Sequence, residues 1–240
     1  MLPMFMQKPF DVQYFQHLKR LFGTALIGYW PLDEAAGAST VTDYSGQAND
    51  GTPSNVTFGQ AGIGDGRTAA SFNGTTSYCN IYSAGLNSDF NTAAGTMALW
   101  VKVSGAGVWT DNITRRIFRI LTDGNNAAQL FKTDTNVLRF NYDAGGVGEL
   151  VDYTHTGLNW FHIALTWDVS GGGEMKAYFN GAQTGSTQTG LGTWVGALTN
   201  TTCCIGSGNI TPTECWSGNL AHAVLLNQVA TAQEVGELAR

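Results

Sequence analysis

The most constraining feature of the sequence is residues 159–181, which read NWFHIALTWDVSGGGEMKAYFNG. In both halves large apolar residues alternate with smaller or polar ones, and this period of two predicts two β-strands. A glycine-rich break separates the strands, and Asn180-Gly181 supplies the positive φ angles of a tight hairpin turn. The first strand carries its apolar face at Phe161, Ile163, Leu165 and Trp167. Trp160 and Trp167 are too bulky for a lone hairpin, so we expect a second layer to cover them, as in a two-sheet sandwich.

The rest of the chain continues this pattern from residue 25 to the C-terminus. Short apolar or alternating runs are separated by turns rich in Gly, Asn and Asp, which predicts further strands. A chain of 240 residues can bury roughly 70% of its unfolded surface in one core. There is no repeat and no linker, so we expect one all-β domain over residues 25–240. Besides the hairpin, the expected strands are 26–30, 56–59, 69–72, 78–82, 97–103, 117–121, 127–131, 137–142, 202–205 and 220–226.

Three further motifs accompany the hairpin in chain order: residues 28–34 (GYWPLDE), residues 43–51 (DYSGQANDG), and residues 70–74 (ASFNG) followed by Tyr78. Together with the hairpin they resemble laminin-G-like domains of the concanavalin A-like lectin and glucanase superfamily. The resemblance implies a two-sheet antiparallel jelly-roll sandwich of the concanavalin A type. These motifs are specific for a fold and much less so for an activity.

The C-terminal end of the chain also follows this pattern. Residues 220–230 read as a closing strand, and Thr231 with Glu234 form a capping box that predicts a short C-terminal helix through Leu238. The segment resembles the closing part of laminin-G-like domains. We therefore expect the domain to be complete at its C-terminus.

Residues 1–24 lie outside the resemblance. Residues 11–22 predict an amphipathic helix that stops at Gly23, with an apolar face at Tyr14, Phe15, Leu18, Leu21 and Phe22. One interpretation is a helix folded back to cap the sandwich. Another is an arm that anchors the protein in a neighbouring subunit or forms a trimer, and membrane-surface binding is a remote third. Residues 1–10 do not have the order of a signal peptide, and no apolar run is long enough to cross a membrane.

Composition narrows the functional classes. The net charge is -6, which argues against nucleic acid as a partner because phosphate binding needs clustered Lys and Arg. Arg115, Arg116 and Arg119 form one basic cluster, which fits either a solvated strand edge or an anion site. Charged residues are only 12% of the chain and Gly numbers 31, so hydroxyl and amide side chains must provide most of the polar surface. That profile suits an extracellular or particle-surface β protein.

The four cysteines show no recognisable spacing. Cys203 and Cys204 are adjacent in an expected strand and point to opposite faces, so they cannot share one partner. Two alternatives are a disulfide bond from either of them to Cys215 and a zinc cluster that includes His222. We expect four free, mostly buried thiols, Cys79 included.

Glycoside hydrolysis, the activity that such a fold can host, needs two carboxylates aimed into one cleft. Related glucanases place them two or four residues apart on one strand, and no such motif occurs here. Glu149 and Asp152 come nearest, but a spacing of three sends them to opposite faces. No nucleophile elbow, phosphate loop or zinc-protease motif is present either. We expect the protein not to be an enzyme.

The resemblance also implies a candidate calcium site, because laminin-G-like domains often bind calcium through loop carboxylates and carbonyls. The matching segments contain the candidates Asp33, Asp43, Asn49 and Asp50. The alternative is that these residues cap turns. The closing strand departs from the family pattern, since Ser217, Ala221 and His222 stand where relatives commonly carry an acidic residue.

For glycan binding, aromatic rings must be exposed to stack on sugars, with amides and hydroxyls beside them. Trp109, Tyr153 and Trp194 fall in polar segments and are the candidate rings, and Asp111, Asn112 and Thr193 are their candidate neighbours. The alternative is that these rings pack loops onto the sandwich. Burial in the core explains four other tryptophans better than sugar binding does: Trp30, Trp100, Trp160 and Trp167.

A single laminin-G-like domain behind a short helical arm resembles small structural proteins of tailed bacteriophages. We therefore expect a non-enzymatic virion surface protein, either a capsid decoration or a head or tail fibre adhesin. Its expected partners are other virion subunits, held through the arm, and host or environmental polysaccharide. We expect a homo-oligomer, with a trimer as the first guess, and neither nucleic-acid binding nor membrane insertion. The alternatives are a bacterial carbohydrate-binding or adhesion module exported by another route and, less favoured, a glycosidase with unfamiliar residues.

Overall fold

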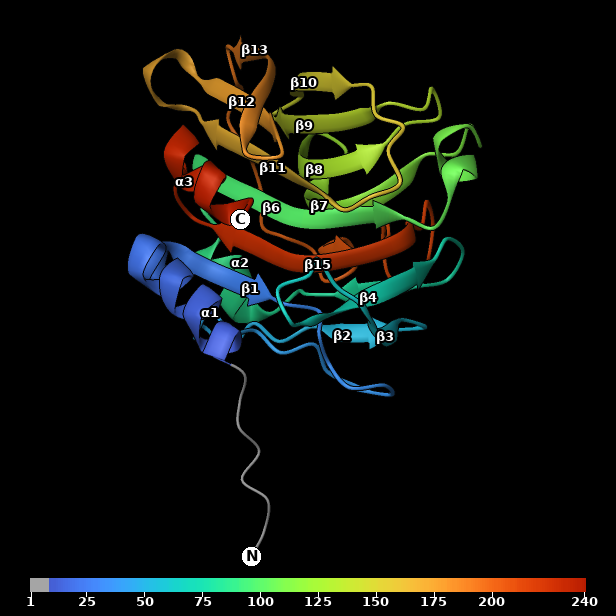
Figure 1. The fold of residues 1–240 in the computed structure, drawn as a ribbon. Helices are drawn as coiled ribbons and strands as arrows, with labels where there is room; N and C mark the ends of the chain where they lie inside the picture. The colour runs from blue at the N-terminus through green and yellow to red at the C-terminus, as the bar shows by residue number, and fades with distance from the viewer. Residues whose placement is uncertain (1–8) are drawn as a thin grey trace, which may run out of the picture.

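The computed structural model describes the backbone of residues 9–240 and the side chains of residues 14–240. Two antiparallel sheets lie face to face, and two helices cover part of the outer face of the larger sheet (Figure 1). The eight-stranded sheet has the order β13-β12-β11-β6-β15-β4-β3, and β1 pairs with the far end of β15. The seven-stranded sheet has the order β10-β9-β8-β7-β14-β5-β2. The expected jelly-roll sandwich is confirmed.

The elements have the following bounds. The larger sheet contains β1 (Leu26–Trp30), β3 (Thr57–Ala61), β4 (Thr68–Asn73), β6 (Ala94–Val103), β11 (Phe161–Asp168), β12 (Glu174–Phe179), β13 (Ala182–Thr189) and β15 (Ser217–Leu226). The smaller sheet contains β2 (Thr52–Ser54), β5 (Tyr78–Asn80), β7 (Arg115–Asp123), β8 (Asn126–Lys132), β9 (Leu138–Ala144), β10 (Val147–Tyr153) and β14 (Cys204–Ile205). The helices are α1 (Pro9–Phe22), α2 (Ala84–Asp89) and α3 (Ala232–Leu238), with short 3-10 turns at Gly23–Ala25, Ala106–Trp109 and Ser170–Gly172.

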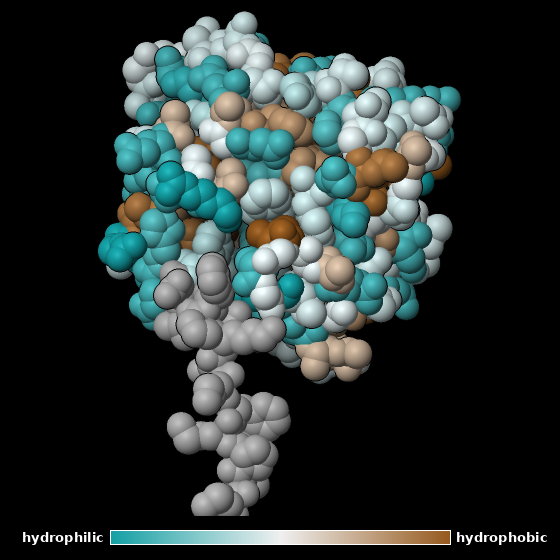
Figure 2. Space-filling view, in the orientation of Figure 1, coloured by the Kyte–Doolittle hydropathy of each residue, from teal (hydrophilic) through white to brown (hydrophobic). Residues whose placement is uncertain are grey.

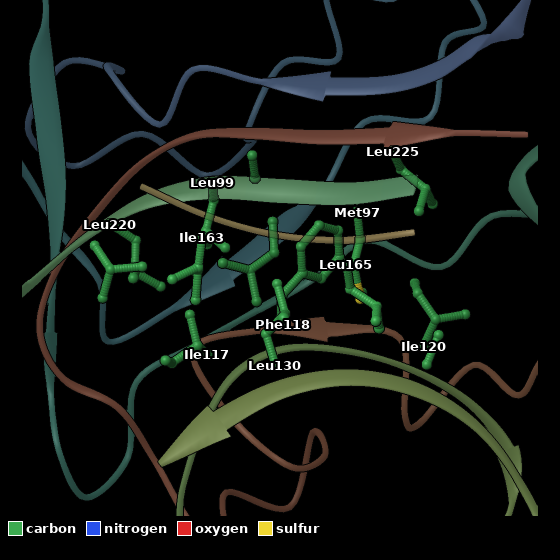
Figure 3. Packing of buried hydrophobic residues seen from close by; sticks show 14 of the residues in the cluster. Met97, Leu99, Ile117, Phe118, Ile120, Leu130, Ile163, Leu165, Leu220 and Leu225 are labelled. Carbon is green, nitrogen blue, oxygen red and sulfur yellow. The ribbon is translucent and has the colours of Figure 1, made fainter. Parts of the chain in front are cut away.

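The main core fills the space between the two sheets. Inward-facing residues of β6, β11 and β15 meet those of β7 and β8, as Figure 3 shows for Leu99, Ile163 and Leu220 opposite Ile117 and Leu130. The central hairpin behaves as its alternation predicts, because Phe161, Ile163, Leu165 and Trp167 are all buried on this inner face. Residues between them in the sequence therefore point to the outer face of the larger sheet.

A second, smaller core lies on that outer face, beneath α1 and α3. Leu18 and Phe22 of α1 and Val235 and Leu238 of α3 pack with outward-facing residues such as Tyr29. The Tyr14 hydroxyl donates a hydrogen bond to the Leu238 carbonyl at 3.1 Å, so the first and last helices of the chain touch. The capping box of α3 is present: Thr231 accepts from the Glu234 N–H, and Glu234 accepts from the Thr231 N–H.

The N-terminal helix therefore caps the sandwich, which is the first of the interpretations given above. Residues 1–8 of the predicted arm lie outside the described residues, and an assembly role for residues 1–24 stays a prediction. Within the described part of the chain, no helix is both long and apolar enough to cross a membrane.

The expectation of free thiols is confirmed. All four cysteines are buried and unbridged, which excludes a bond from Cys203 or Cys204 to Cys215 in this structure. Burial raises the pKa of the Cys203 thiol to about 12 and that of Cys204 to about 12, so both stay protonated near neutral pH. The zinc alternative has no support either, since no group of three metal-ligating side chains occurs among the described residues.

Candidate functional site

A pocket of about 750 Å³ opens on the outer face of the larger sheet. Its walls come from α1, from α3 and the last residue of the chain, and from the loop between β3 and β4, and its floor from β6 and β15. This is the face seen in Figure 2, where hydrophilic side chains lie beside smaller hydrophobic areas. The pocket residues used below are Tyr14, His17, Arg20, Asp65, Trp100, His222 and Glu237.

The floor of the pocket combines an indole ring with histidines from neighbouring strands. Trp100 of β6 is the register partner of His162 in β11 on one side and of Ala221 in β15 on the other. The Trp100 and His162 rings lie edge to face with centroids 5.5 Å apart. His222 follows Ala221 and lines the pocket itself. Trp100 is half-buried, so part of its ring is left for a ligand.

Two buried nitrogens have no hydrogen-bond partner in the part of the chain that the structure describes: Nε1 of Trp100, on this floor, and Nδ1 of His162, which pairs with Trp100 across the strands but does not line the pocket. His162 is 1% exposed, and burial, with a smaller contribution from nearby His222, lowers its pKa to about 3. The imidazole is therefore neutral at physiological pH. Buried polar groups usually find a partner, and these two unpartnered atoms lie on neighbouring strands at the pocket.

A bulge in β15 directs His222 toward Asp65. The register between β15 and β6 shifts between Ala221 and Val224, and His222 adopts φ 51°, a left-handed conformation that is uncommon for residues other than glycine. His222 Nε2 lies 3.0 Å from Asp65 Oδ2, and its Nδ1 lies 2.9 Å from the Tyr29 hydroxyl. Burial alone would raise the pKa of the Asp65 carboxyl, but contacts with His222 and with backbone N–H groups lower it below its ordinary value.

The rim of the pocket is a chain of polar contacts between α1 and α3. His17 Nε2 lies 3.2 Å from Glu237 Oε2, and Arg20 Nη2 lies 3.0 Å from His17 Nδ1. A guanidinium has no acceptor, so His17 Nδ1 accepts from Arg20 and its Nε2 carries the proton that points to Glu237. Glu237 also pairs with Arg240 at 3.1 Å.

The predicted glycan rings lie elsewhere, and the prediction that the two tryptophans are exposed is wrong. Trp109 is 4% exposed and donates its indole N–H to the Gly157 carbonyl at 3.0 Å. Trp194 is 7% exposed and donates to the Thr122 hydroxyl at 3.0 Å. Both belong to the main core, because their loops fold back onto the ends of the sandwich. Tyr153 is half-buried, with its ring centroid 4.5 Å from that of Phe179.

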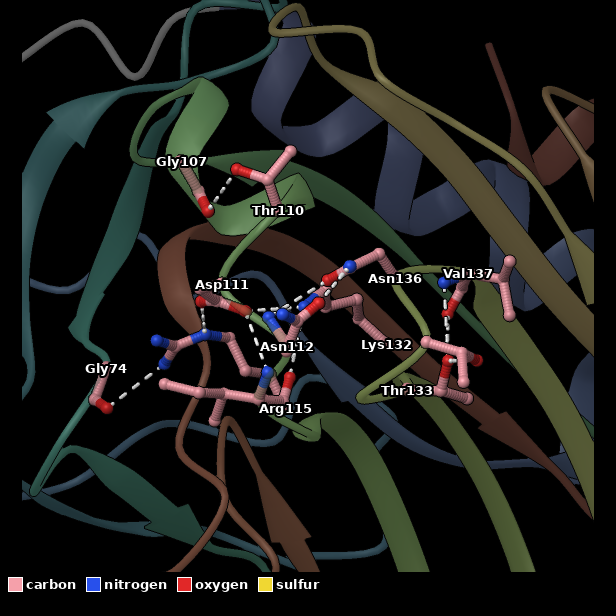
Figure 4. A network of polar contacts seen from close by, with 12 residues as sticks. Gly74, Gly107, Thr110, Asp111, Asn112, Arg115, Lys132, Thr133, Asn136 and Val137 are labelled. Carbon is pink, nitrogen blue, oxygen red and sulfur yellow. Dashed lines mark hydrogen bonds and ion pairs between the residues drawn. The ribbon is translucent and has the colours of Figure 1, made fainter.

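Two of their three predicted polar neighbours, Asp111 and Asn112, form contacts within the fold that hold loops in place. Asp111 Oδ2 pairs with Arg115 at 2.7 Å and its Oδ1 with Lys132 at 2.5 Å (Figure 4). Asn112 accepts from the Asn136 amide at 2.6 Å. Thr193 is exposed, next to Trp194. The structure places Trp109 against His155 and Trp194 against Phe90, so the six residues form no common surface.

The basic cluster is also accounted for within the fold. Arg115 binds Asp111, and Arg116 binds Glu214 at 2.7 Å. Arg119 donates to the Gly208 carbonyl at 2.8 Å. These contacts favour a structural role over an anion site.

The four calcium candidates do not fit a calcium ion. Asp33 Oδ2 pairs with Arg67 at 2.7 Å. Asp43 accepts four hydrogen bonds, from the backbone N–H groups of Tyr29, Ser45 and Asn49 and from the Ser45 hydroxyl, while Asp50 accepts from the Asp43 N–H. Asn49 uses its amide to bind the Ile27 carbonyl. Calcium needs six to eight oxygen ligands, but both Asp43 oxygens and one oxygen each of Asp33 and Asp50 already accept from donors, and no group of three metal-ligating side chains occurs among the described residues, so the turn-capping alternative describes this segment.

The chain belongs to a laminin-G-type family: the family described as the concanavalin A-like lectin/glucanases superfamily matches residues 73–236. No curated protein sequence matches the chain.

Solved structures with the same fold include three of different kinds. Domain 4 of an extracellular arabinanase from Geobacillus stearothermophilus, solved with arabinotriose, is 19% identical, has a TM-score of 0.63, and aligns over 90% of this chain and 98% of its own. The binding domain of botulinum neurotoxin serotype D is 12% identical, with a TM-score of 0.68, over 91% of this chain and 52% of its own. Trypanosoma rangeli sialidase, in complex with sialic acid, is 15% identical, with a TM-score of 0.65, over 95% of this chain and 36% of its own.

This chain thus spans about a third of the sialidase and about half of the toxin domain. At these identities the likeness concerns the fold alone.

Proposed function

We propose that the protein is a non-enzymatic carbohydrate-binding domain whose site is the pocket on the outer face of the larger sheet. The observation that carries the proposal is the floor of that pocket. There the half-buried indole ring of Trp100 lines the pocket, and both its own Nε1 and the Nδ1 of His162 on the adjacent strand are buried without a partner in the described structure. An aromatic face stacks on a sugar ring, and the nitrogens bind hydroxyl groups.

Carbohydrate fits this pocket better than a purely apolar ligand does. The indole N–H is a donor, and the neutral His162 has a nitrogen free beside it, so a hydroxyl group that both donates and accepts suits the pair. The volume of about 750 Å³ falls in the range of small-molecule sites and is ample for a short oligosaccharide. The arabinanase domain solved with arabinotriose supports the ligand class by its fold.

The electrostatics of the pocket support binding without hydrolysis. A glycosidase needs a carboxylic acid whose pKa is raised so that it can protonate the leaving oxygen. The pKa of Asp65 is shifted the opposite way, and Glu237 is held by His17 and Arg240. Neither carboxyl group is arranged as a proton donor.

We place this binding domain on the surface of a tailed-bacteriophage virion, as a capsid decoration or fibre adhesin that grips host or environmental polysaccharide. The sequence resemblance and the low charge support this setting. A homotrimer joined to other virion subunits through residues 1–24 would raise weak single-site affinity by avidity. An exported bacterial adhesion module is the second candidate, supported by the same pocket.

A glycan array tests the function with three proteins: the natural chain, Trp100→Ala and Trp160→Ala. Trp160 is also half-buried but does not line the pocket, so its variant is the matched control. The proposal predicts binding that Trp100→Ala abolishes and Trp160→Ala keeps, with circular dichroism showing that both variants are folded. Binding that survives in Trp100→Ala, or no binding by the folded natural chain, would contradict it.

A further inference from the structure

Arg20 stands out among the charged groups of the pocket because no carboxylate in the described part of the chain lies within ion-pair distance of it. Its guanidinium donates instead to His17 Nδ1 at 3.0 Å. By contrast, Arg67, Arg115, Arg116, Arg139 and Arg240 each pair with an Asp or Glu. In a protein of net charge -6, the pocket thus keeps one uncompensated guanidinium at its rim.

The acidic groups of the same pocket are already engaged inside the fold. Asp65 faces His222 at 3.0 Å and accepts from the Arg67 N–H at 3.1 Å. Glu237 is held between His17 and Arg240. Arg20 is exposed and uses one nitrogen toward His17, so several of its N–H donors point to solvent.

We propose that Arg20 is the receptor for a carboxylate on the bound sugar, so that the pocket selects acidic saccharides that contain uronic or sialic acid units. This rests on the proposed function and specifies its ligand. A guanidinium fork matches a carboxylate in two parallel hydrogen bonds, while Trp100 supports the sugar ring. The carboxylate would supply the charge that Arg20 lacks within the protein.

Lys19 provides the matched control for this role. It is the next residue of α1 and shares the favourable position of a cation in the last helical turn. Its ammonium lies 5.9 Å from the Phe15 ring centroid and does not line the pocket. Replacing either residue by Gln removes one positive charge from the helix, but only Arg20→Gln removes it from the site.

The test compares ligands that differ only in charge, such as trigalacturonate and its methyl ester, or sialyllactose and its methyl ester, by calorimetry with the full chain. We expect a preference for the acid of about tenfold, the size of one charged hydrogen-bond contact. Arg20→Gln should bring the preference close to one, and Lys19→Gln should keep it.

Equal binding of acid and ester, or a preference that survives in Arg20→Gln, would overturn the inference. If Trp100→Ala then still abolished binding of both forms, the proposed function would stand without it. If neither form bound, and no glycan of the array did, both would be overturned.

Discussion

Replacing Leu18 by Ala tests whether α1 is an integral part of the domain. The side chain is 0% exposed and belongs to the small core beneath the helices. Truncation of fully buried leucines costs about 3 kcal/mol, the sum of lost transfer free energy and the cavity left behind. For a domain of this size, a loss of about 3 kcal/mol corresponds to a fall in Tm of about 6 to 12 °C.

Thermal unfolding followed by circular dichroism measures this shift. The control is Gln16→Ala, which changes an exposed residue of the same helix to a better helix former and should leave Tm within about 1 °C. A detached arm would predict the same Tm for Leu18→Ala as for the natural chain. That result would refute the packing of α1 described above.

Three further outcomes are expected. Gly95→Ala should destabilise the protein strongly, because a Cβ there would lie 2.1 Å from Trp167 Cζ2, whereas Gly124→Ala, with nothing within 4 Å, should be tolerated. The free energy of unfolding should fall as pH drops from about 6.5 toward 3, because the unfolded state protonates His162 and the folded state does not. In urea titrations at several pH values, His162→Gln should reduce this pH dependence by up to about 1.4 kcal/mol per pH unit. An unchanged pH dependence would contradict the burial of a neutral His162. EDTA should leave Tm unchanged, and a rise of several degrees with added calcium would contradict the turn-capping assignment.

The sandwich was predictable because its signals are local. The alternation in residues 159–181 and at Met97 to Val103 identified the strands, and the capping box located the last helix. β13 was not predicted, since its sequence AQTGSTQT has no apolar face and its pairing with β12 holds it in place. β10 was missed as well, because charged and glycine residues interrupt its pattern.

The site was harder to predict because it depends on which surface a distant helix covers. On the sequence, Trp100 is predicted to lie in the core, and that prediction is wrong, since Trp100 is half-buried and lines the pocket on the outer face of the larger sheet. The alternation of each strand did contain the information. Trp100 lies between the inward-facing Leu99 and Val101, and His162 follows the inward-facing Phe161, so both should point to the outer face. The opposite error, at Trp109 and Trp194, arose because polar neighbours suggested exposure while the loops pack inward.

The indole N–H resonances of the seven tryptophans provide the most direct test of the proposed site. In ¹⁵N-labelled protein, assigned with a Trp100→Phe variant, a bound oligosaccharide should shift the Trp100 signal most, because Trp100 lines the pocket and its N–H has no partner within the described structure. The signals of Trp109 and Trp194 should stay in place, since both N–H groups already donate to the fold. A saccharide that moved those two signals and left Trp100 unchanged would contradict the proposed site.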